Sequence, residues 1–158
     1  MQDYGLQTRV ARFHNIYGPY GQWHGERDKA PAAICRKVAT AIRDGIDYIT
    51  VWGDGEQTRS FLFVEDCVDA IYKLTMSNFG EPMNIGTDRS IVINDLARMV
   101  MEIAGKELNI RNDLSKPQGV RGRNADITLI KQVLKWEPKV TLEDGMERLY
   151  KWVSSQVG

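Results

Sequence analysis

The stretch from residue 30 to residue 55 reads APAAICRKVATAIRDGIDYITVWGDG and joins a helix pattern to a strand pattern. Pro31 suits the first turn of a helix, where its missing N–H costs nothing. Apolar side chains follow at helical spacing until Gly45, a residue typical of helix ends: Ile34, Val38, Ala41 and Ile42. Residues 48–52 are β-branched or aromatic and precede a tight turn at 53–55, which predicts a strand.

The alternation of strand and helix patterns continues on both sides of this unit. Further strands are predicted at 8–15, 60–64 and 83–86, and the strand at 48–52 either pairs with 60–64 or leads into a ligand loop. Helices are predicted from Glu65 with a buried stripe, from an N-cap at Asn94 to Gly105, and over 127–134 and 141–156. The stripe after Glu65 comprises Val64, Val68, Ile71 and Leu74. This alternation predicts an α/β fold, with 1–158 as a single domain.

Composition excludes several classes of protein. The chain has 158 residues, 42% of them hydrophobic and 27% charged, which supports a folded core and excludes collagen-like or disordered chains. Its 21 basic and 21 acidic residues balance, so we expect no nucleic acid and no membrane as partner. Cys35 and Cys67 form neither a disulfide scaffold nor a metal motif, and no apolar run spans a bilayer. We therefore expect a cytoplasmic protein.

Motifs for phosphate loops and metals are missing. Neither G-x-G-x-x-G nor G-x-x-x-x-G-K-[ST] occurs, so the chain has no recognisable site for the pyrophosphate of a dinucleotide. The histidines are His14 and His24, and neither has a companion at metal-ligand spacing. We expect His14 to be a structural residue with its hydrogen bonds satisfied and His24 to lie on the surface of a loop.

Three loops place a basic or amide side chain beside a glycine: RFHNIYGP at 12–19, WGDGEQTRSF at 52–61 and VRGRNAD at 120–126. An arginine offers two parallel charge-assisted hydrogen bonds to a phosphate, and a nearby glycine lets backbone N–H groups approach the oxygens. Taken singly, each loop is also consistent with a solvated charged surface. Together they predict a diphosphate site.

These loops, in this order, resemble the C-terminal part of the extended short-chain dehydrogenase/reductases (SDRs) that modify nucleotide sugars. With RDKAPAAICRK at 27–37, the chain is similar to the GDP-mannose 3,5-epimerase family over nearly its whole length. The resemblance implies a substrate-binding portion whose N-terminal dinucleotide-binding domain is absent. It also implies that strands 8–15 and 83–86 complete a Rossmann sheet in the full enzyme.

The family's reaction oxidises the hexose transiently at C4 with NAD, and a cysteine and a lysine then invert C3 and C5. Lys29 matches the lysine, and closure that desolvates it would lower its pKa for this role. The cysteine does not carry over, because Cys35 and Cys67 fall on predicted helix faces as buried packing residues. The family's Tyr-x-x-x-Lys is also absent. We expect NAD in the full-length family, none on this chain alone, and no activity without the missing half.

Further positions match the family's substrate-binding residues: Asn15, Asp28, Lys37, Gln57, Arg59, Arg121 and Arg123. Asn15 would contact the ligand near a strand end, Gln57 and Arg59 the sugar and diphosphate, and the two late arginines the diphosphate. Lys37 is either a ligand contact or a solvated helix residue. Asp28 replaces the usual glutamate, and its shorter side chain could leave the sugar out of reach.

The ligand implied is a nucleoside diphosphate sugar of the GDP-mannose kind, although another GDP- or dTDP-linked hexose stays open. Strand edges left without neighbours predict a homodimer, a rearranged sheet, or pairing with the missing Rossmann half. The alternative function is a non-catalytic binding or assembly module derived from an epimerase.

Overall fold

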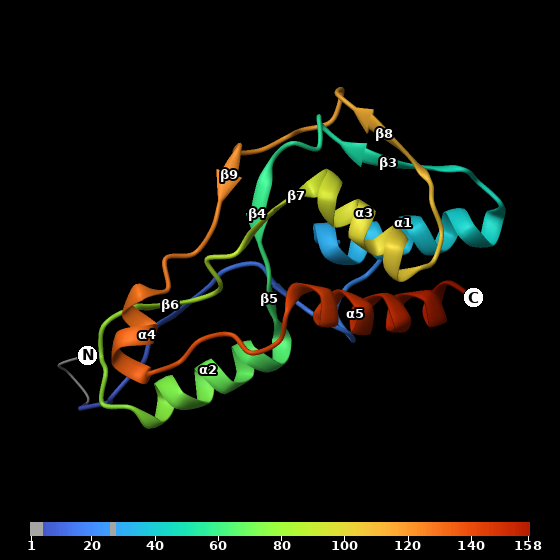
Figure 1. Cartoon of the computed structure of the whole chain (residues 1–158). Helices are drawn as coiled ribbons and strands as arrows, with labels where there is room; N and C mark the ends of the chain where they lie inside the picture. Colours follow the sequence, from blue (N-terminus) through green and yellow to red (C-terminus); the bar gives the residue numbers. More distant parts are fainter. Residues whose placement is uncertain (1–4, 26–27) are drawn as a thin grey trace.

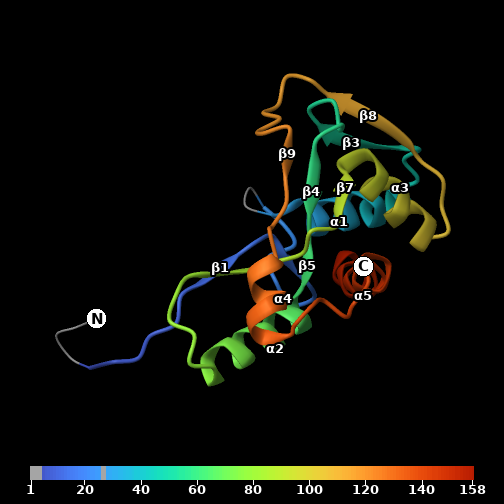
Figure 2. The ribbon, with the colours of Figure 1, turned by 60° about the vertical axis from the view of Figure 1, so that its left-hand side comes forward.

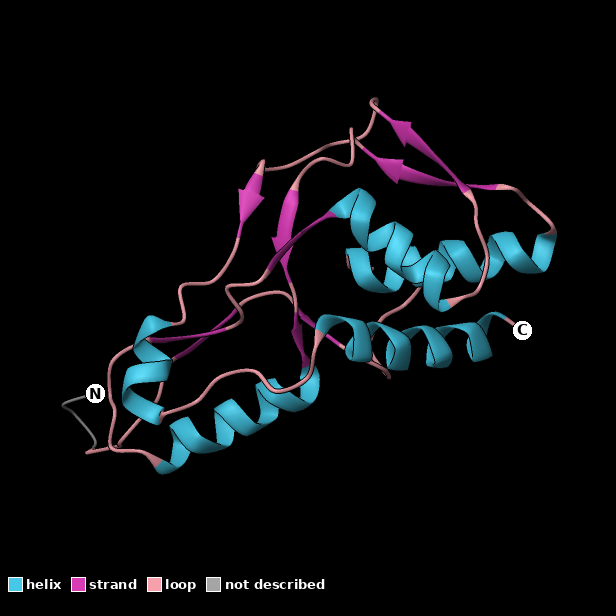
Figure 3. Cartoon of the chain, in the orientation of Figure 1, coloured by secondary structure: helices cyan, strands magenta, loops and turns pink. Residues whose placement is uncertain are grey.

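The computed structural model describes residues 5–25 and 28–158 and confirms the α/β fold class. Its helices are α1 (Ala30–Asp44), α2 (Val64–Met76), α3 (Ile93–Ile103), α4 (Thr128–Leu134) and α5 (Leu142–Val157). Its strands are β1 (Ala11–Phe13), β2 (Ile16–Tyr17), β3 (Tyr48–Trp52), β4 (Thr58–Ser60), β5 (Leu62–Phe63), β6 (Met83–Ile85), β7 (Ser90–Val92), β8 (Asn109–Asp113) and β9 (Gly122–Arg123). These strands are short and scattered among the helices (Figure 3).

The described residues form two apolar cores. In the first core, α1 packs against α3 and α5, and the β3–β8 strand pair lies beside them (Figures 1 and 2). In the second core, α2 and α4 enclose the β1–β6 pair. The apolar stripe of α5, which comprises Leu142, Met146, Leu149 and Val153, is buried in the first core.

The parallel pair β2–β5 joins the two cores, with Ile16 opposite Leu62 and Tyr17 opposite Phe63. Successive side chains of a strand point to opposite faces. Leu62 accordingly belongs to the second core, while Tyr17 and Phe63 belong to the first. Helix α5 can pack directly against Tyr17 because residue 145 is glycine. A Cβ there would lie 2.2 Å from the Tyr17 hydroxyl oxygen.

The remaining strands pair over long sequence distances. β1 pairs with β6 and β3 with β8, both in parallel, whereas β4 lies between antiparallel β7 and parallel β9. The prediction that β3 pairs with residues 60–64 was therefore wrong, and the alternative of a strand leading into a loop holds. Strands β7, β8 and β9 were not predicted, because each is short and stabilised by a distant partner.

Three further expectations need correction. Asn94 does not cap α3, which begins at Ile93; its side chain donates instead to the carbonyl oxygen of Asp54. Val68 is 59% exposed, and Cys67 takes the buried place on α2. The first predicted strand, 8–15, is shorter in the structure: β1 covers Ala11–Phe13, and Asn15, with a φ of 46°, lies between it and β2. None of the helices in the described residues is both long and apolar enough to cross a bilayer.

Asp66 fixes the connection between α4 and α5. Its carboxylate is 5% exposed and accepts the backbone N–H groups of Lys139 at 3.1 Å and Val140 at 2.9 Å. Replacement by alanine would leave these two donors without a partner. We expect Asp66→Ala to lower the free energy of unfolding by about 1–3 kcal/mol in urea titrations.

The matched control is Asp88→Ala, which removes a carboxylate whose ion pair with Lys131 lies on the surface at 3.5 Å. It should change the free energy of unfolding by about 0.5 kcal/mol or less. Equal losses in the two variants would contradict the anchoring role of Asp66.

Candidate functional site

A cavity of about 860 Å³ opens between the first half of α1, the end of β3 and strand β4. Six of the predicted site residues line it: Asn15, Asp28, Lys29, Lys37, Gln57 and Arg59. Its apolar wall comes from both α1 and the strands, through Ala33, Ile34, Val51 and Phe61. This volume and this mixture of apolar wall with a few polar groups are typical of small-molecule sites.

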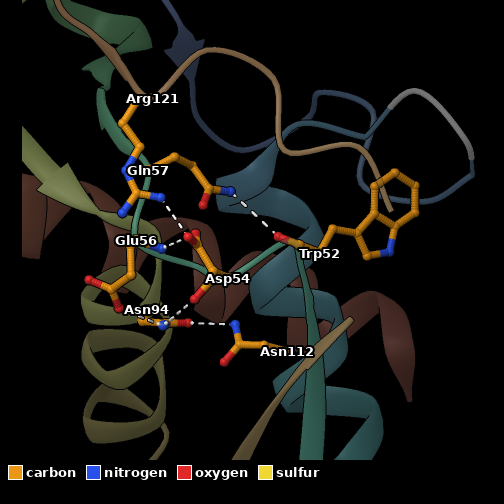
Figure 4. A network of polar contacts seen from close by, with 7 residues as sticks. All are labelled: Trp52, Asp54, Glu56, Gln57, Asn94, Asn112 and Arg121. Carbon is orange, nitrogen blue, oxygen red and sulfur yellow. Dashed lines mark hydrogen bonds and ion pairs between the residues drawn. The ribbon is translucent and has the colours of Figure 1, made fainter. Parts of the chain in front are cut away.

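The turn between β3 and β4 delivers Gln57 and Arg59 to the cavity. The turn is held from below by Asn94, whose side-chain NH₂ donates to the Asp54 carbonyl oxygen at 3.1 Å and to Glu56 at 3.2 Å (Figure 4). The Gln57 side chain donates to the Trp52 carbonyl oxygen at 3.5 Å. Its own Oε1 is buried and has no hydrogen-bond partner in the described residues.

Arg59 and Arg123 face each other across the parallel β4–β9 pair. Residues paired directly in a parallel ladder project from the same face, so the side chains of the two arginines leave their strands on one side of the sheet. Among residues 5–25 and 28–158, no carboxylate forms an ion pair with either arginine. An arginine without an ion-pair partner can bind an anion through charge-assisted hydrogen bonds.

Arg121 lies elsewhere than the sequence suggested. It does not line the cavity, and its guanidinium forms an ion pair with Asp54 at 2.5 Å on the outer side of the turn (Figure 4). This contact lowers the pKa of the Asp54 carboxyl, and the Glu56 backbone N–H lowers it further. Arg123 also lies outside the cavity lining, although its strand position is beside Arg59.

One end of the cavity has an aromatic wall that the sequence interpretation missed. Trp52 is 51% exposed, and the ammonium groups of Lys37 and Lys116 lie 5.9 and 5.8 Å from its ring centre. Lys37 also donates to the Thr50 carbonyl oxygen at 2.6 Å. Burial lowers the pKa of Lys37, as does the charge of Arg36. Strand alternation could have predicted this position, because the side chains of Trp52 and the buried Val51 point to opposite faces of β3.

The other end of the cavity carries Lys29, Asp28 and Asn15. Lys29 immediately precedes α1, and its ammonium donates to the Ile16 carbonyl oxygen at 3.4 Å. Asp28 is engaged by Arg36 at 2.6 Å. Asn15 donates to the Ser60 carbonyl oxygen at 2.9 Å and so joins β1 to β4. Residue 27, which opens the predicted 27–37 segment, lies outside the described residues.

The two cysteines and the two histidines do not line the cavity. Both cysteines are buried as expected, and burial raises the pKa of each thiol. His14 differs from expectation, because its Nδ1 is buried without a hydrogen-bond partner, and burial lowers its pKa. His24 is exposed and stacks on Trp23. No cluster of His, Cys, Asp and Glu suited to a metal ion occurs in the part of the chain described.

The described residues contain no glycine-rich strand-to-helix loop of the kind that binds the pyrophosphate of NAD. Strand β5 runs directly into α2, and β7 directly into α3, so neither junction leaves a glycine-rich loop for a pyrophosphate. The loop between β2 and α1 contains glycines but not the G-x-G-x-x-G spacing.

Comparisons with known proteins identify the family and the fold of the chain. Residues 1–86 match the model of the NAD dependent epimerase/dehydratase family. The chain is 47% identical to GDP-mannose 3,5-epimerase 1 of Oryza sativa subsp. indica over 99% of its own length and 40% of that protein. The chain therefore spans less than half the length of this curated relative.

Two solved structures have the same fold over similar spans. A UDP-glucose 4-epimerase of Thermotoga maritima, with UDP-glucose, is 30% identical with a TM-score of 0.86, covering 99% of this chain and 48% of that chain. A UDP-glucuronic acid 4-epimerase of Bacillus cereus, in complex with UDP-glucuronic acid and NAD, is 25% identical with a TM-score of 0.80. That match covers 98% of this chain and 47% of that chain.

The turn that carries Gln57 depends on the absence of a side chain at residue 55. Gly55 has φ +73°, and a Cβ there would lie 2.0 Å from Oδ1 of Asn94. We expect Gly55→Ala to destabilise the chain through both backbone strain and this overlap. Gly105→Ala is the matched control, because Gly105 has φ +63° with nothing within 4 Å of the added Cβ.

Thermal or urea unfolding should show a loss of about 1 kcal/mol for Gly105→Ala from backbone strain alone. The loss for Gly55→Ala should be about 1–3 kcal/mol larger, since overpacking adds to the strain. Equal losses would mean that Asn94 moves away without cost.

Proposed function

Because the chain belongs to the NAD dependent epimerase/dehydratase family, we propose that it is the substrate-binding portion of a nucleotide-sugar epimerase that takes a ligand of the GDP-mannose kind. The observation that carries this proposal is the single cavity shared by six family-matched residues, from Asn15 on one side to Arg59 on the other. The identity with GDP-mannose 3,5-epimerase supports the choice of ligand.

The charges of the cavity support one orientation of the ligand. The diphosphate lies near Arg59, with Arg123 of the neighbouring strand completing the pair of guanidinium groups. The base lies against the Trp52 ring, whose face is large, half-exposed and flanked by two lysines. The hexose then extends toward Lys29 and Asn15, where Lys29 takes the role of acid or base. Gln57, which also lines the cavity, lies on the sugar side of Arg59 in this orientation.

NAD and the oxidation at C4 belong to another part of the enzyme in this proposal. The described residues provide no pyrophosphate loop, and the sequence has no Tyr-x-x-x-Lys. The chain alone therefore binds the nucleotide sugar without turning it over. Residues 1–158 act as a single substrate-binding domain, and the two buried free cysteines support a reducing, cytoplasmic location.

Calorimetric titration with GDP-mannose tests the binding proposal. We expect a dissociation constant between micromolar and low millimolar. Arg59→Ala should weaken binding by about tenfold or more, because a hydrogen bond to a charged group contributes about 1.5–3 kcal/mol. Arg123→Ala should act in the same direction through the second guanidinium group.

Arg98→Ala is the control, since Arg98 pairs with Asp95 on the outside of α3, away from the cavity. It should leave the affinity unchanged. Absence of heat at millimolar GDP-mannose would reject the binding proposal and favour the non-catalytic assembly module.

The second core supports a further part of the proposal, a partner at the edge of β1. In the described residues β1 has a neighbour on one side alone, and Phe13 on it is 56% exposed. On the adjacent helix α2, Val68, Tyr72 and Met76 form an exposed apolar stripe at a spacing of four residues. A two-stranded parallel sheet with an open edge needs cover, and the exposed stripe of α2 adds apolar surface to the same core. The cover is a dinucleotide-binding half in the complete enzyme, or a second copy when this chain is alone.

Light scattering of the purified chain tests whether two copies pair. We expect a particle of twice the monomer mass. Phe13→Lys should return it to a monomer, because an edge lysine opposes strand pairing while the β1–β6 hydrogen bonds remain. Lys151→Ala, on the exposed face of α5, serves as a control that should stay dimeric. A monomeric wild-type chain would contradict the pairing of copies.

A further inference from the structure

A strap of chain, residues 114–121, passes over the turn 53–57 at the mouth of the cavity. Lys116 and Pro117 of the strap line the cavity directly. The strap lies against the turn at residue 53, where an added Cβ would come within 2.4 Å of Cγ of Gln118. At the end of the strap, the Thr58 backbone N–H donates to the Arg121 carbonyl oxygen at 2.9 Å.

Asp54 connects this strap to the buried part of the first core. One carboxylate oxygen forms the 2.5 Å ion pair with Arg121, and the other accepts the Glu56 N–H at 2.9 Å. The Asp54 backbone is fixed in turn by Asn94, whose own Oδ1 accepts from Asn112 at 3.3 Å (Figure 4). Asn94 is buried, so the turn side of the ion pair is rigid and the strap side is exposed.

We propose that Asp54 and Arg121 form a clamp that holds strap 114–121 closed over the nucleotide end of the cavity. Asp54 is then a positioning residue, and Arg121 serves the strap instead of binding the diphosphate. The clamp keeps Lys116 beside Trp52, at the end of the cavity assigned to the base. Its effect on ligand affinity rests on the proposed function of this cavity.

The exposure of the pair makes the clamp reversible. The Arg121 side chain is 66% exposed and that of Asp54 34%, and ion pairs of this kind stabilise a contact only slightly. The strap can therefore open for a ligand to enter and leave. A role of Arg121 as a diphosphate ligand would instead require the ligand to displace the Asp54 carboxylate, so the two assignments predict opposite effects of neutralising Asp54.

Neutral variants of both partners separate these assignments: Asp54→Asn, Arg121→Gln and the double variant. If the clamp holds the strap, each variant weakens GDP binding about two- to fivefold, and the double variant is no weaker than the single ones. Exchange of the Thr58 amide hydrogen, followed by NMR without ligand, should accelerate by a similar factor in all three. The charge-reversed pair Asp54→Arg with Arg121→Asp should recover slow exchange and the original affinity.

The matched control is Glu147→Gln, which removes an ion pair of the same 2.5 Å length on α5 and should change neither readout. Tighter GDP binding by Asp54→Asn, or a loss in Arg121→Gln at least tenfold beyond that in Asp54→Asn, would overturn the clamp. Unchanged Thr58 exchange in Asp54→Asn would overturn it as well. If wild type failed to bind GDP, the proposed function would fail, while Thr58 exchange would still decide the clamp.

Discussion

The parallel contact between β2 and β5 is the constraint on which the rest of the structure depends. Two residues from each strand are enough to link the two cores, because strand alternation places Leu62 in one core and Tyr17 with Phe63 in the other. A shift of one residue would exchange these side chains between the cores. Asn15 lies immediately before β2, and Arg59 lies three residues before β5, so this register also influences where the two residues are placed. The cavity lies on the side of the first core, whose Ile34, Val51 and Phe61 line it.

The charged residues that line the cavity determine which kind of ligand it can bind. The whole chain is neutral, yet Lys29, Lys37, Arg59 and Lys116 line the cavity, and Asp28 is already engaged by Arg36. The apolar wall beside Lys37 excludes water, which makes an unpaired ammonium costly and its pKa low. An anionic ligand relieves that cost. Local arrangement, and not net charge, therefore gives this neutral chain a cavity lined by cations.

Local patterns predicted the parts of the fold that local forces determine. The strand at 48–52 has the predicted bounds, and the Thr141 side chain caps α5 by accepting the Asp144 N–H at 3.1 Å. Asn94 shows where this approach fails: its residue type favours a helix cap, but its amide is used by a turn 40 positions away in the chain. The difference between Arg121 and Arg123 was equally hidden, since it depends on which of the two pairs with Arg59 across β4–β9.

The two cores differ in how much apolar surface they leave exposed. The cavity, the turn 53–57 and the strap all belong to the first core, which three helices cover, whereas the second core leaves the β1 edge and the outer stripe of α2 exposed. Exposed apolar surface of this kind favours association, while the cavity requires access for a small ligand. Since the two features lie on different cores, a partner that covers β1 need not close the cavity. The proposed binding of a nucleotide sugar and the proposed assembly with a second unit therefore involve different cores, which the short β2–β5 contact joins.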